Sequence, residues 1–196
     1  MTLGTPVLIQ YATDESASVR QAAVYGLGVL AQHAGAAFTD EQCRRACAAL
    51  VAVVTAPTAR DDDSESASDN AISALGKMML HRADVLAASP SILDTWLSYL
   101  PLRADMDEAV IVHAQLCSLV ERHGAALLGA HGERAPTLVR ALVNVLTSPE
   151  LSDQQTRQRA TALLHAMRAQ PAASAALAQL QLSEHESARL NAALSG

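Results

Sequence analysis

Apolar residues recur along the chain at intervals of three and four positions, which is the spacing of one face of an α-helix. A first stripe runs from Val19 to Ala31 and stops before Gly35, a residue suited to ending a helix. A second stripe follows Thr39 and stops at Pro57. The buried faces expected for these two helices are Val19, Ala22, Ala23, Leu27 and Leu30, and then Cys43, Ala46, Cys47, Leu50, Val51 and Val54. This stretch is therefore predicted to form two amphipathic helices.

Polar residues mark the starts of several expected helices. A capping box needs Ser or Thr followed three positions later by Glu or Gln, because each side chain bonds a backbone N–H of the other residue. The pairs with this spacing are Thr39 and Gln42, Ser152 and Gln155, and Ser183 and Glu186. Asp105 with Glu108 opens another helix, and Ser89 before Pro90 gives an N-cap followed by proline in the first turn.

The pattern continues to the end of the chain and predicts about eight helices in pairs. Later stripes are expected at 72–79, 92–100, 109–120 (ending at Gly124), 138–146, 160–167 and 190–194. Gly28 and Gly76 stand in similar contexts in successive pairs, and intervals of about 40–47 residues are typical of two-helix HEAT and armadillo repeats. We therefore expect an all-α, right-handed α-solenoid of about four helical hairpins. The expected array is 1–196, with hairpins 1–35, 36–83, 89–124 and 132–170, terminal helices 171–196, and an acidic loop at 58–68.

Composition supports this fold class and narrows the function. Ala and Leu account for 67 of 196 residues against five aromatic residues, so strand-rich folds are excluded. The net charge of −6 comes with 14 dispersed basic residues, which argues against nucleic-acid binding. Three cysteines predict no disulfide framework, and neither a secretory signal nor a membrane span is recognisable. These features predict a soluble, intracellular protein with no membrane partner.

Several segments, taken in order, resemble the end of importin-β-type nuclear transport receptors, in particular the importin subunit beta-3 group. The first is VRQAAVYGLGVLAQHAG at 19–35, which resembles the second helix of a HEAT repeat. The others are DNAISALGKMM (69–79), LDTWLSYLPLRADMDEAV (93–110), QLCSLVERHGAALLG (115–129), PTLVRALVNVL (136–146) and QLSEHESARLNAAL (181–194). The resemblance covers nearly the whole chain and departs from the family at 58–68 and 171–180.

The resemblance implies a C-terminal fragment of a long receptor that acts as a protein-binding scaffold in nuclear import. For the full-length receptor it implies cargo proteins with basic localisation signals and the Ran GTPase, whose main site lies in N-terminal repeats, outside this chain. It implies cytoplasmic and nuclear localisation, no cofactor and no catalysis. A phosphatase-binding or tubulin-binding HEAT scaffold is the alternative, and an all-α enzyme is a third interpretation.

Single residues that suggest chemistry have structural interpretations as well. Cys43 and Cys47 are four apart and could share a metal, but both lie on an apolar stripe and no further ligand completes a set. His33 and His123 precede helix-ending glycines, where a partly cationic ring would meet the negative end of the helix dipole. Gly26 and Gly28 inside a helix predict close approach of a neighbouring helix, and Trp96 is expected to anchor adjacent hairpins.

The acidic loop is the candidate docking element. Its carboxylates precede a helix expected to line the concave side, and they would also stabilise the positive end of that helix dipole. A solvated loop is the plainer interpretation, and contact with a basic partner is the other. The candidate partner-binding residues are Asp61, Asp62, Asp63, Glu65, Asp69 and Asn70. The N-terminal hairpin is a second candidate surface, because Leu8 and Ile9 would need a neighbouring repeat to cover them, and its exposure predicts self-association.

Overall fold

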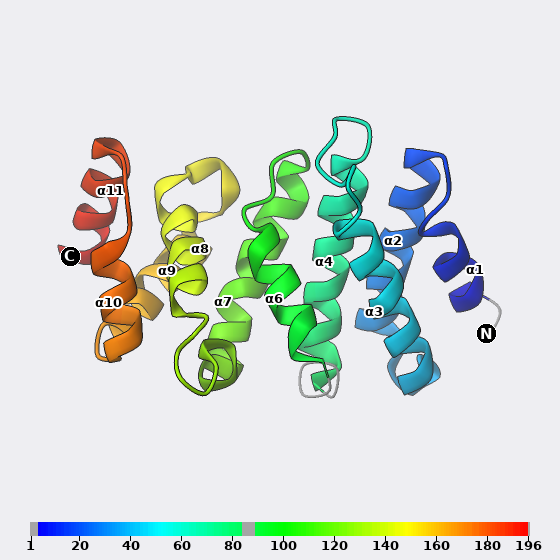
Figure 1. Ribbon diagram of the computed structural model, residues 1–196, viewed down its shortest axis with the longest axis horizontal. Helices are drawn as coiled ribbons and strands as arrows, with labels where there is room; N and C mark the ends of the chain where they lie inside the picture. Colours follow the sequence, from blue (N-terminus) through cyan, green and yellow to red (C-terminus); the bar gives the residue numbers. More distant parts are fainter. Residues whose placement is uncertain (1–3, 84–88, 196) are drawn as a thin grey trace. The chain divides into compact units, whose positions relative to one another are not determined.

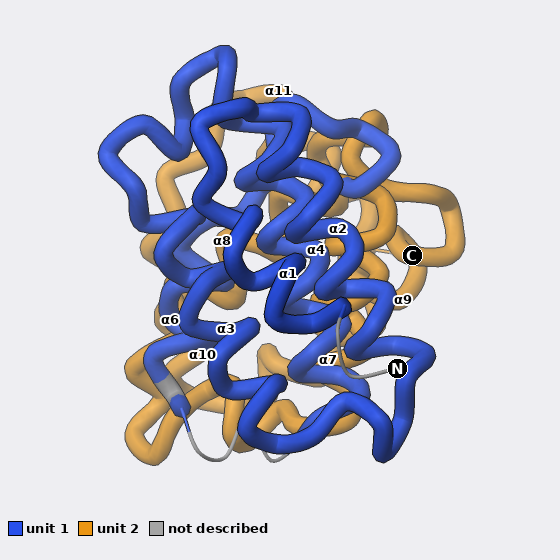
Figure 2. The backbone as a smooth tube through the Cα atoms, turned by 90° about the vertical axis from the view of Figure 1, so that its right-hand side faces the viewer, with its two compact units in different colours: residues 1–108 blue, residues 109–196 orange. Residues whose placement is uncertain are grey.

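The computed structural model describes residues 4–83 and 89–195. Over these residues the protein is all-α, with ten α-helices, two short 3-10 helices and no strand (Figure 1). The chain divides into two compact units, residues 1–108 and 109–196 (Figure 2). The prediction of an all-α protein is therefore confirmed, while the continuity of one array over 1–196 stays a prediction.

Successive helices are joined by short connections, and α1 contacts α2, α3 contacts α4, and α8 contacts α9. Unit 1 contains α1 (Gly4–Tyr11), α2 (Ala17–His33), η1 (Gly35–Ala37), α3 (Asp40–Val54), α4 (Glu65–His81), α6 (Pro90–Tyr99) and the first turn of α7 (Met106–Leu128). Unit 2 contains the rest of α7, then α8 (Ala135–Thr147), η2 (Pro149–Leu151), α9 (Gln154–Met167), α10 (Pro171–Gln179) and α11 (Glu184–Ser195).

In unit 1 each helix lies beside the corresponding helix of the next pair. The second helices α2 and α4 pack against each other, and the first helices α1, α3 and α6 stack in the same order. This arrangement buries one apolar face of each hairpin against its neighbour, as expected for an α-solenoid. In unit 2, α8 packs against α9, α10 and α11.

The contact between α2 and α4 depends on Gly28. A Cβ atom at this position would lie 3.1 Å from both the Cα and the Cβ of Ala74 on α4. A Cβ at Gly26 would instead lie 3.0 Å from the end of the Leu8 side chain on α1. The prediction that both glycines mark close approach of neighbouring helices is therefore confirmed.

This close approach also turns the buried face of α2 away from the predicted one. The buried residues are Ala23, Val24, Leu27, Gly28 and Ala31. Val19 and Ala22 are exposed and Leu30 is half-buried, so the prediction was wrong for these three residues. The hydrophobicity pattern missed the register because a glycine carries no apolar side chain, yet Gly28 lies at the centre of the packed face.

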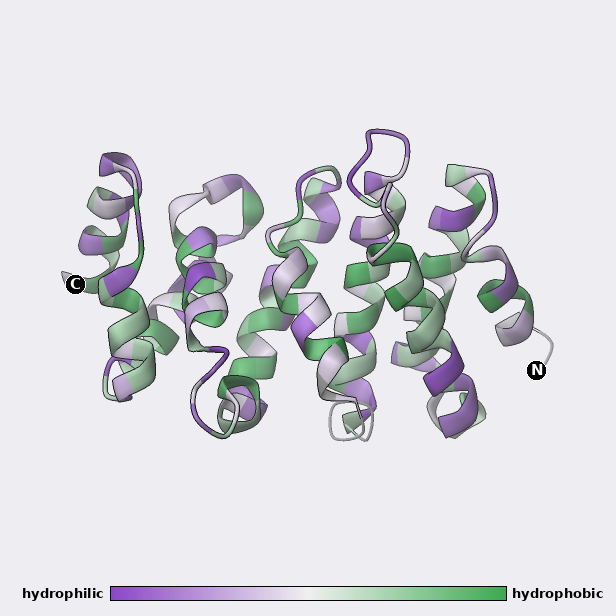
Figure 3. Ribbon diagram, in the orientation of Figure 1, coloured by the Kyte–Doolittle hydropathy of each residue, from purple (hydrophilic) through white to green (hydrophobic). Residues whose placement is uncertain are grey.

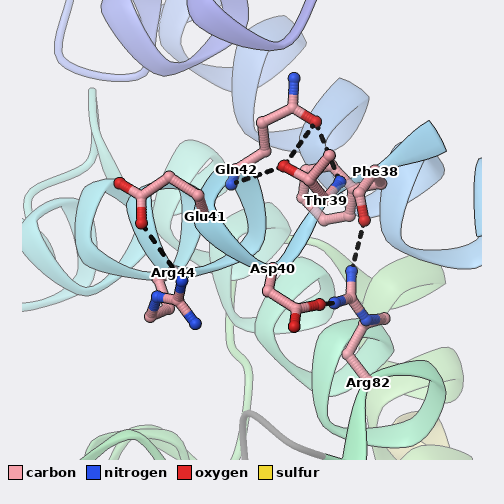
Figure 4. Close-up of polar contacts among 7 residues, drawn as sticks. All are labelled: Phe38, Thr39, Asp40, Glu41, Gln42, Arg44 and Arg82. Carbon is pink, nitrogen blue, oxygen red and sulfur yellow. Dashed lines mark hydrogen bonds and ion pairs between the residues drawn. The ribbon is translucent and has the colours of Figure 1, made fainter. Parts of the chain in front are cut away.

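The buried face of α3 is close to the one predicted from the second apolar stripe. Cys43, Ala46, Cys47 and Leu50 are buried on α3, and Val53 is buried where Val51 was expected. The Thr39 hydroxyl accepts a hydrogen bond from the Gln42 N–H, and the Gln42 side chain accepts one from the Thr39 N–H (Figure 4). The capping box at the start of α3 is thus confirmed.

Trp96 is fully buried and joins α6 to α4. Its indole Nε1 donates a hydrogen bond of 2.9 Å to the carbonyl oxygen of Ile72. Ile92, Leu93 and Leu97 are buried beside it on α6. The prediction that Trp96 anchors adjacent hairpins is confirmed.

In unit 2 the structure differs from the sequence prediction at one helix start and at one helix end. The N-cap of α9 is Asp153, whose carboxylate accepts from the Thr156 N–H at 2.6 Å, and Ser152 is buried with its hydroxyl donating to Val145 O. The capping box predicted at Ser152 and Gln155 was therefore wrong, because the N-cap lies one residue later, whereas the capping box at Ser183 and Glu186 is present. The helix α7 does not end at Gly124; its geometry breaks at His123 and then continues to Leu128.

Candidate functional site

The connection between α3 and α4 carries the exposed acidic residues. It runs from Thr55 to Ser64 as a series of turns, and Asp61, Asp62 and Asp63 are exposed on it. Figure 3 shows this loop as a mainly hydrophilic segment above α4. The loop is shorter than the predicted 58–68, because α4 already begins at Glu65. It presents three adjacent carboxylates to solvent.

Arg60 holds this loop against α6. Its guanidinium lies 3.4 Å from the centre of the Tyr99 ring, donates to the Tyr99 carbonyl, and forms an ion pair of 3.3 Å with Glu65. The Tyr99 hydroxyl also donates to Ala59 O at 3.4 Å, and burial raises the pKa of Tyr99 to about 12. The Glu65 carboxylate is therefore already paired with Arg60 within the protein.

A second acidic loop lies beside the first. Asp14 and Glu15, from the connection between α1 and α2, line a groove of about 470 Å³ together with Asp61 and Asp63. The apolar residues of its lining are Ala12, Ala52, Val53, Ala56 and Ala59. The long side chains of Lys and Arg place an aliphatic stem on apolar surface and a cation in water or beside a carboxylate. The groove suits such a side chain.

Arg20 is the basic residue of the groove lining and ties its two sides together. It donates to the carbonyl oxygens of Asp14 at 2.9 Å and Glu15 at 3.0 Å, and to the hydroxyl of Ser64 at 2.9 Å. Because the guanidinium is bound by neutral oxygens, it leaves the carboxylates of Asp14 and Glu15 free of an ion pair with it. The groove keeps an excess of negative charge.

Asp69 and Asn70 lie apart from the groove, on the buried side of α4. The Asp69 carboxylate accepts hydrogen bonds from the N–H groups of Arg103, Ala104 and Asp105 at 2.9–3.3 Å. Asn70 donates to the Asp105 carboxylate at 3.0 Å. Burial raises the pKa of Asp69, although the three N–H donors act in the opposite direction. Both side chains hold the connection between α6 and α7 and do not face the groove.

A larger hollow of about 730 Å³ lies between the end of α2, the start of α3 and the end of α4. Its charged groups bind one another: Arg82 forms an ion pair with Asp40 and donates to the Phe38 carbonyl at 2.6 Å (Figure 4). Glu41 pairs with Arg44 at 3.3 Å. These contacts fasten the start of α3 to α4 and indicate a structural role.

The remaining candidates have structural positions. Cys43 and Cys47 are buried in the core, and the Cys47 sulfur lies 3.1 Å from that of Met78, so their interpretation as core residues is confirmed. No group of three or more His, Cys, Asp or Glu is placed to hold a metal ion within 4–83 and 89–195. In the same part of the chain, no helix combines the length and apolarity that crossing a bilayer requires.

Sequence reasoning found Asp61 to Asp63 but missed Asp14 and Glu15. The signal was present, because both acidic segments connect the two helices of a hairpin. In a stack of hairpins, such connections lie at the same end. Two acidic connections in successive hairpins therefore predict neighbouring carboxylates.

Comparison with known proteins identifies the repeat type. The HEAT repeat family matches residues 5–34, which comprise α1, α2 and their connection. A probable importin-5 homolog of Dictyostelium discoideum is 32% identical over 106 residues, which cover 53% of this chain and 10% of that protein. The first hairpin thus matches the HEAT repeat family, and about half of the chain is similar to an importin.

Two further importins show the same similarity. Importin-4 of Mus musculus is 33% identical over 103 residues, covering 53% of this chain and 9% of that protein. Importin subunit beta-3 of Saccharomyces cerevisiae is 23% identical over 150 residues, covering 76% of this chain and 14% of that protein. The matched part of this chain thus corresponds to between 9% and 14% of the length of these relatives.

Proposed function

We propose that the chain is part of an importin-β-type nuclear transport receptor and acts there as a protein-binding scaffold. The observation that carries this proposal is the similarity of its HEAT hairpins to three importins. The complete receptor shuttles between cytoplasm and nucleus, and it acts by binding rather than by catalysis. Cargo proteins with basic localisation signals are its ligands, and the Ran GTPase binds repeats outside this chain.

Two experiments test this assignment. Sequencing the transcript upstream of the Met1 codon is expected to show an open reading frame that continues into further HEAT repeats. Depleting the complete protein from cells is then expected to reduce nuclear accumulation of reporters that carry basic signals. Unchanged import of every such reporter would contradict a transport role while leaving the repeat type intact.

The acidic groove is proposed as a contact for basic cargo segments. Its four lining carboxylates and the apolar residues between them fit extended Lys-rich or Arg-rich segments. We expect the chain to bind a fluorescent basic peptide, measured by anisotropy, more strongly at 50 mM than at 150 mM salt, because exposed charges attract through a screened field. Changing Asp61, Asp62 and Asp63 to Asn should weaken binding, chiefly through the association rate.

A matched variant separates local from overall charge effects. Neutralising three exposed acidic residues elsewhere, Asp107, Glu150 and Glu184, removes the same net charge without touching the groove. Equal weakening by both triple variants would show that the peptide responds to net charge only. No measurable binding by the unaltered chain would remove the groove from the proposal.

The N-terminal hairpin is proposed to self-associate in this chain. Its large exposed apolar residues are Val7 (48% exposed), Tyr11 (43%), Val19 (38%), Tyr25 (50%) and Val29 (36%), whereas Leu8 and Ile9 are half-buried. Asp14, Glu15 and Arg20, the charged residues between Gly4 and Ala37, lie at one end of the hairpin. Apart from Lys77 of α4, whose ammonium lies 5.4 Å from the centre of the Tyr25 ring, this surface carries no charge away from that end, so it can meet its copy with little burial of charge.

Sedimentation velocity tests this contact. We expect association to rise with concentration and to be abolished by Val29→Glu. Ile111→Glu is the control, because Ile111 is 42% exposed but lies in unit 2. A monomer at every concentration, or equal effects of the two substitutions, would refute self-association through α1 and α2.

A further inference from the structure

A buried histidine joins α7 to the connection between α8 and α9. The side chain of His113 is fully buried, and its Nδ1 lies 2.8 Å from the carbonyl oxygen of Leu151. A carbonyl oxygen only accepts hydrogen bonds, so Nδ1 carries the proton and Nε2 of the neutral ring carries none. Nε2 is buried and has no hydrogen-bond partner among the described residues. A second proton would therefore have no acceptor at Nε2.

The charged groups on the elements around His113 do not neutralise the positive charge that a second proton would give its ring. The other ionisable side chains there are Asp107, Glu108, Cys117, Glu121, Arg122 and His123 on α7, Arg140 on α8, Glu150 in η2, Asp153 at the start of α9, and Arg157, Arg159 and His165 within α9. The Asp153 carboxylate accepts a hydrogen bond from the Thr156 N–H, and Arg157 donates to the carbonyl oxygens of Pro149 and Ser152. Arg159 pairs with Glu121, and Arg140 donates to Gln181 O.

Glu108 is buried but lies five positions before His113, about 140° around the axis of α7, and so on another side of the helix. Burial raises the pKa of Cys117 to about 11, so this thiol is neutral. Burial lowers the pKa of His113 below its ordinary 6.5, although the carbonyl oxygens of Leu151 and Ala109 favour the protonated ring. Glu150 is exposed. The histidine site thus disfavours the imidazolium.

The two residues at the point where His113 makes its contact, Leu151 and Ser152, are themselves buried. Leu151 ends η2 with 6% exposure, and the neighbouring Ser152 donates to Val145 O from a buried position. The N–H of Leu151 bonds Ser148 O, so the turn is compact. A ring that must reach water to keep its second proton would pull away from this turn and leave the Leu151 carbonyl unpaired.

We propose that His113 is an acid-sensitive lock, which fastens the α8–α9 connection to α7 when neutral and releases it when the ring gains a second proton. The release is a local opening of residues 148–156 in unit 2. It does not depend on the proposed transport function, since it rests on contacts within unit 2. The His113 ring binds a second proton more tightly in the opened state than in the closed state. Lowering the pH therefore favours opening.

Amide hydrogen exchange with mass spectrometry tests the lock. After correction for the intrinsic exchange rate, protection of residues 148–156 should fall between pH 7.5 and 5.5, by at most about tenfold, the limit for a ring whose opened-state pKa is about 6.5. His113→Asn keeps an N–H donor near the Nδ1 position but cannot titrate, so its protection should be independent of pH. His165→Asn, an exposed histidine on α9, should behave as the unaltered chain.

Nitrogen-15 NMR of the unaltered protein provides a readout if His113→Asn does not fold. At pH 7.5 we expect Nδ1 of His113 to be protonated and Nε2 to be bare, with titration below pH 6.5. Titration at or above 6.5, constant protection of 148–156 across this range, or the same acid response in a folded His113→Asn variant would each overturn the proposal.

Discussion

Replacing Gly28 with Ala tests how tightly α2 and α4 approach. The added methyl group would lie 3.1 Å from the Cα and Cβ of Ala74 and 3.3 Å from Lys77 Cδ. Ala74 has no side-chain torsion that could relieve the contact, so the helices must separate, at a cost of about 1–3 kcal/mol. Alanine also favours helix over glycine by about 1 kcal/mol. The expected net effect is a loss of stability of about 1 kcal/mol.

Gly26→Ala is the matched control in the same helix. Its added methyl group meets only the Leu8 side-chain end, at 3.0 and 3.1 Å, and this end can rotate away. The helix propensity gain should then dominate, and stability should rise by up to about 1 kcal/mol. The two substitutions are chemically identical, so any difference between them reports the neighbouring helix.

Urea denaturation followed by Trp96 fluorescence measures both variants, because this tryptophan is buried in unit 1. A shift of the midpoint without a change of slope gives the difference in the free energy of unfolding. A double-mutant cycle with Ala74→Gly should show favourable coupling between the two substitutions of at least about 0.5 kcal/mol. A Gly28→Ala variant as stable as Gly26→Ala, or no coupling to Ala74, would refute the close-packing argument.

Two further substitutions test buried contacts of unit 1. Trp96→Ala should lower the free energy of unfolding by about 3–5 kcal/mol through the cavity it leaves, while Trp96→Phe should cost less; circular dichroism during urea unfolding measures both, and equal small losses would contradict the anchor role. Asp69→Ala should cost about 2–3 kcal/mol, because the Ala104 and Asp105 N–H groups lose their acceptor. The raised pKa of Asp69 means that its contribution is greatest at low pH and declines as pH rises through the folded-state pKa, so Asp69→Ala should flatten this part of a stability-versus-pH curve.

The sequence predicted helices and most of their buried faces, because side-chain spacing and capping residues act locally. The Thr39 and Ser183 capping boxes are confirmed for this reason. The register of α2 could not be predicted, since the contact of Gly28 with Ala74 joins residues far apart in the chain. Local pattern therefore fixes where a helix forms more reliably than which side it buries.

The candidate site likewise has a part that the sequence predicts and a part that it does not. An acidic run is visible in the sequence, so Asp61 to Asp63 were found as exposed carboxylates. Asp69 belongs to the same run, but its environment depends on the N–H groups of residues 103–105, which arrive from the next hairpin. Charge spacing alone could not distinguish the exposed group from the buried one.

The clamp of Arg60 on Tyr99 has a consequence for recognition at the acidic loop. A flexible loop loses backbone freedom when a ligand fixes it, at about 1–2 kcal/mol for each residue. Here the stacking on Tyr99 and the ion pair with Glu65 have already restricted the loop in the free protein. A partner that binds Asp61 to Asp63 therefore meets carboxylates already held in place, and a larger share of its interaction energy becomes affinity.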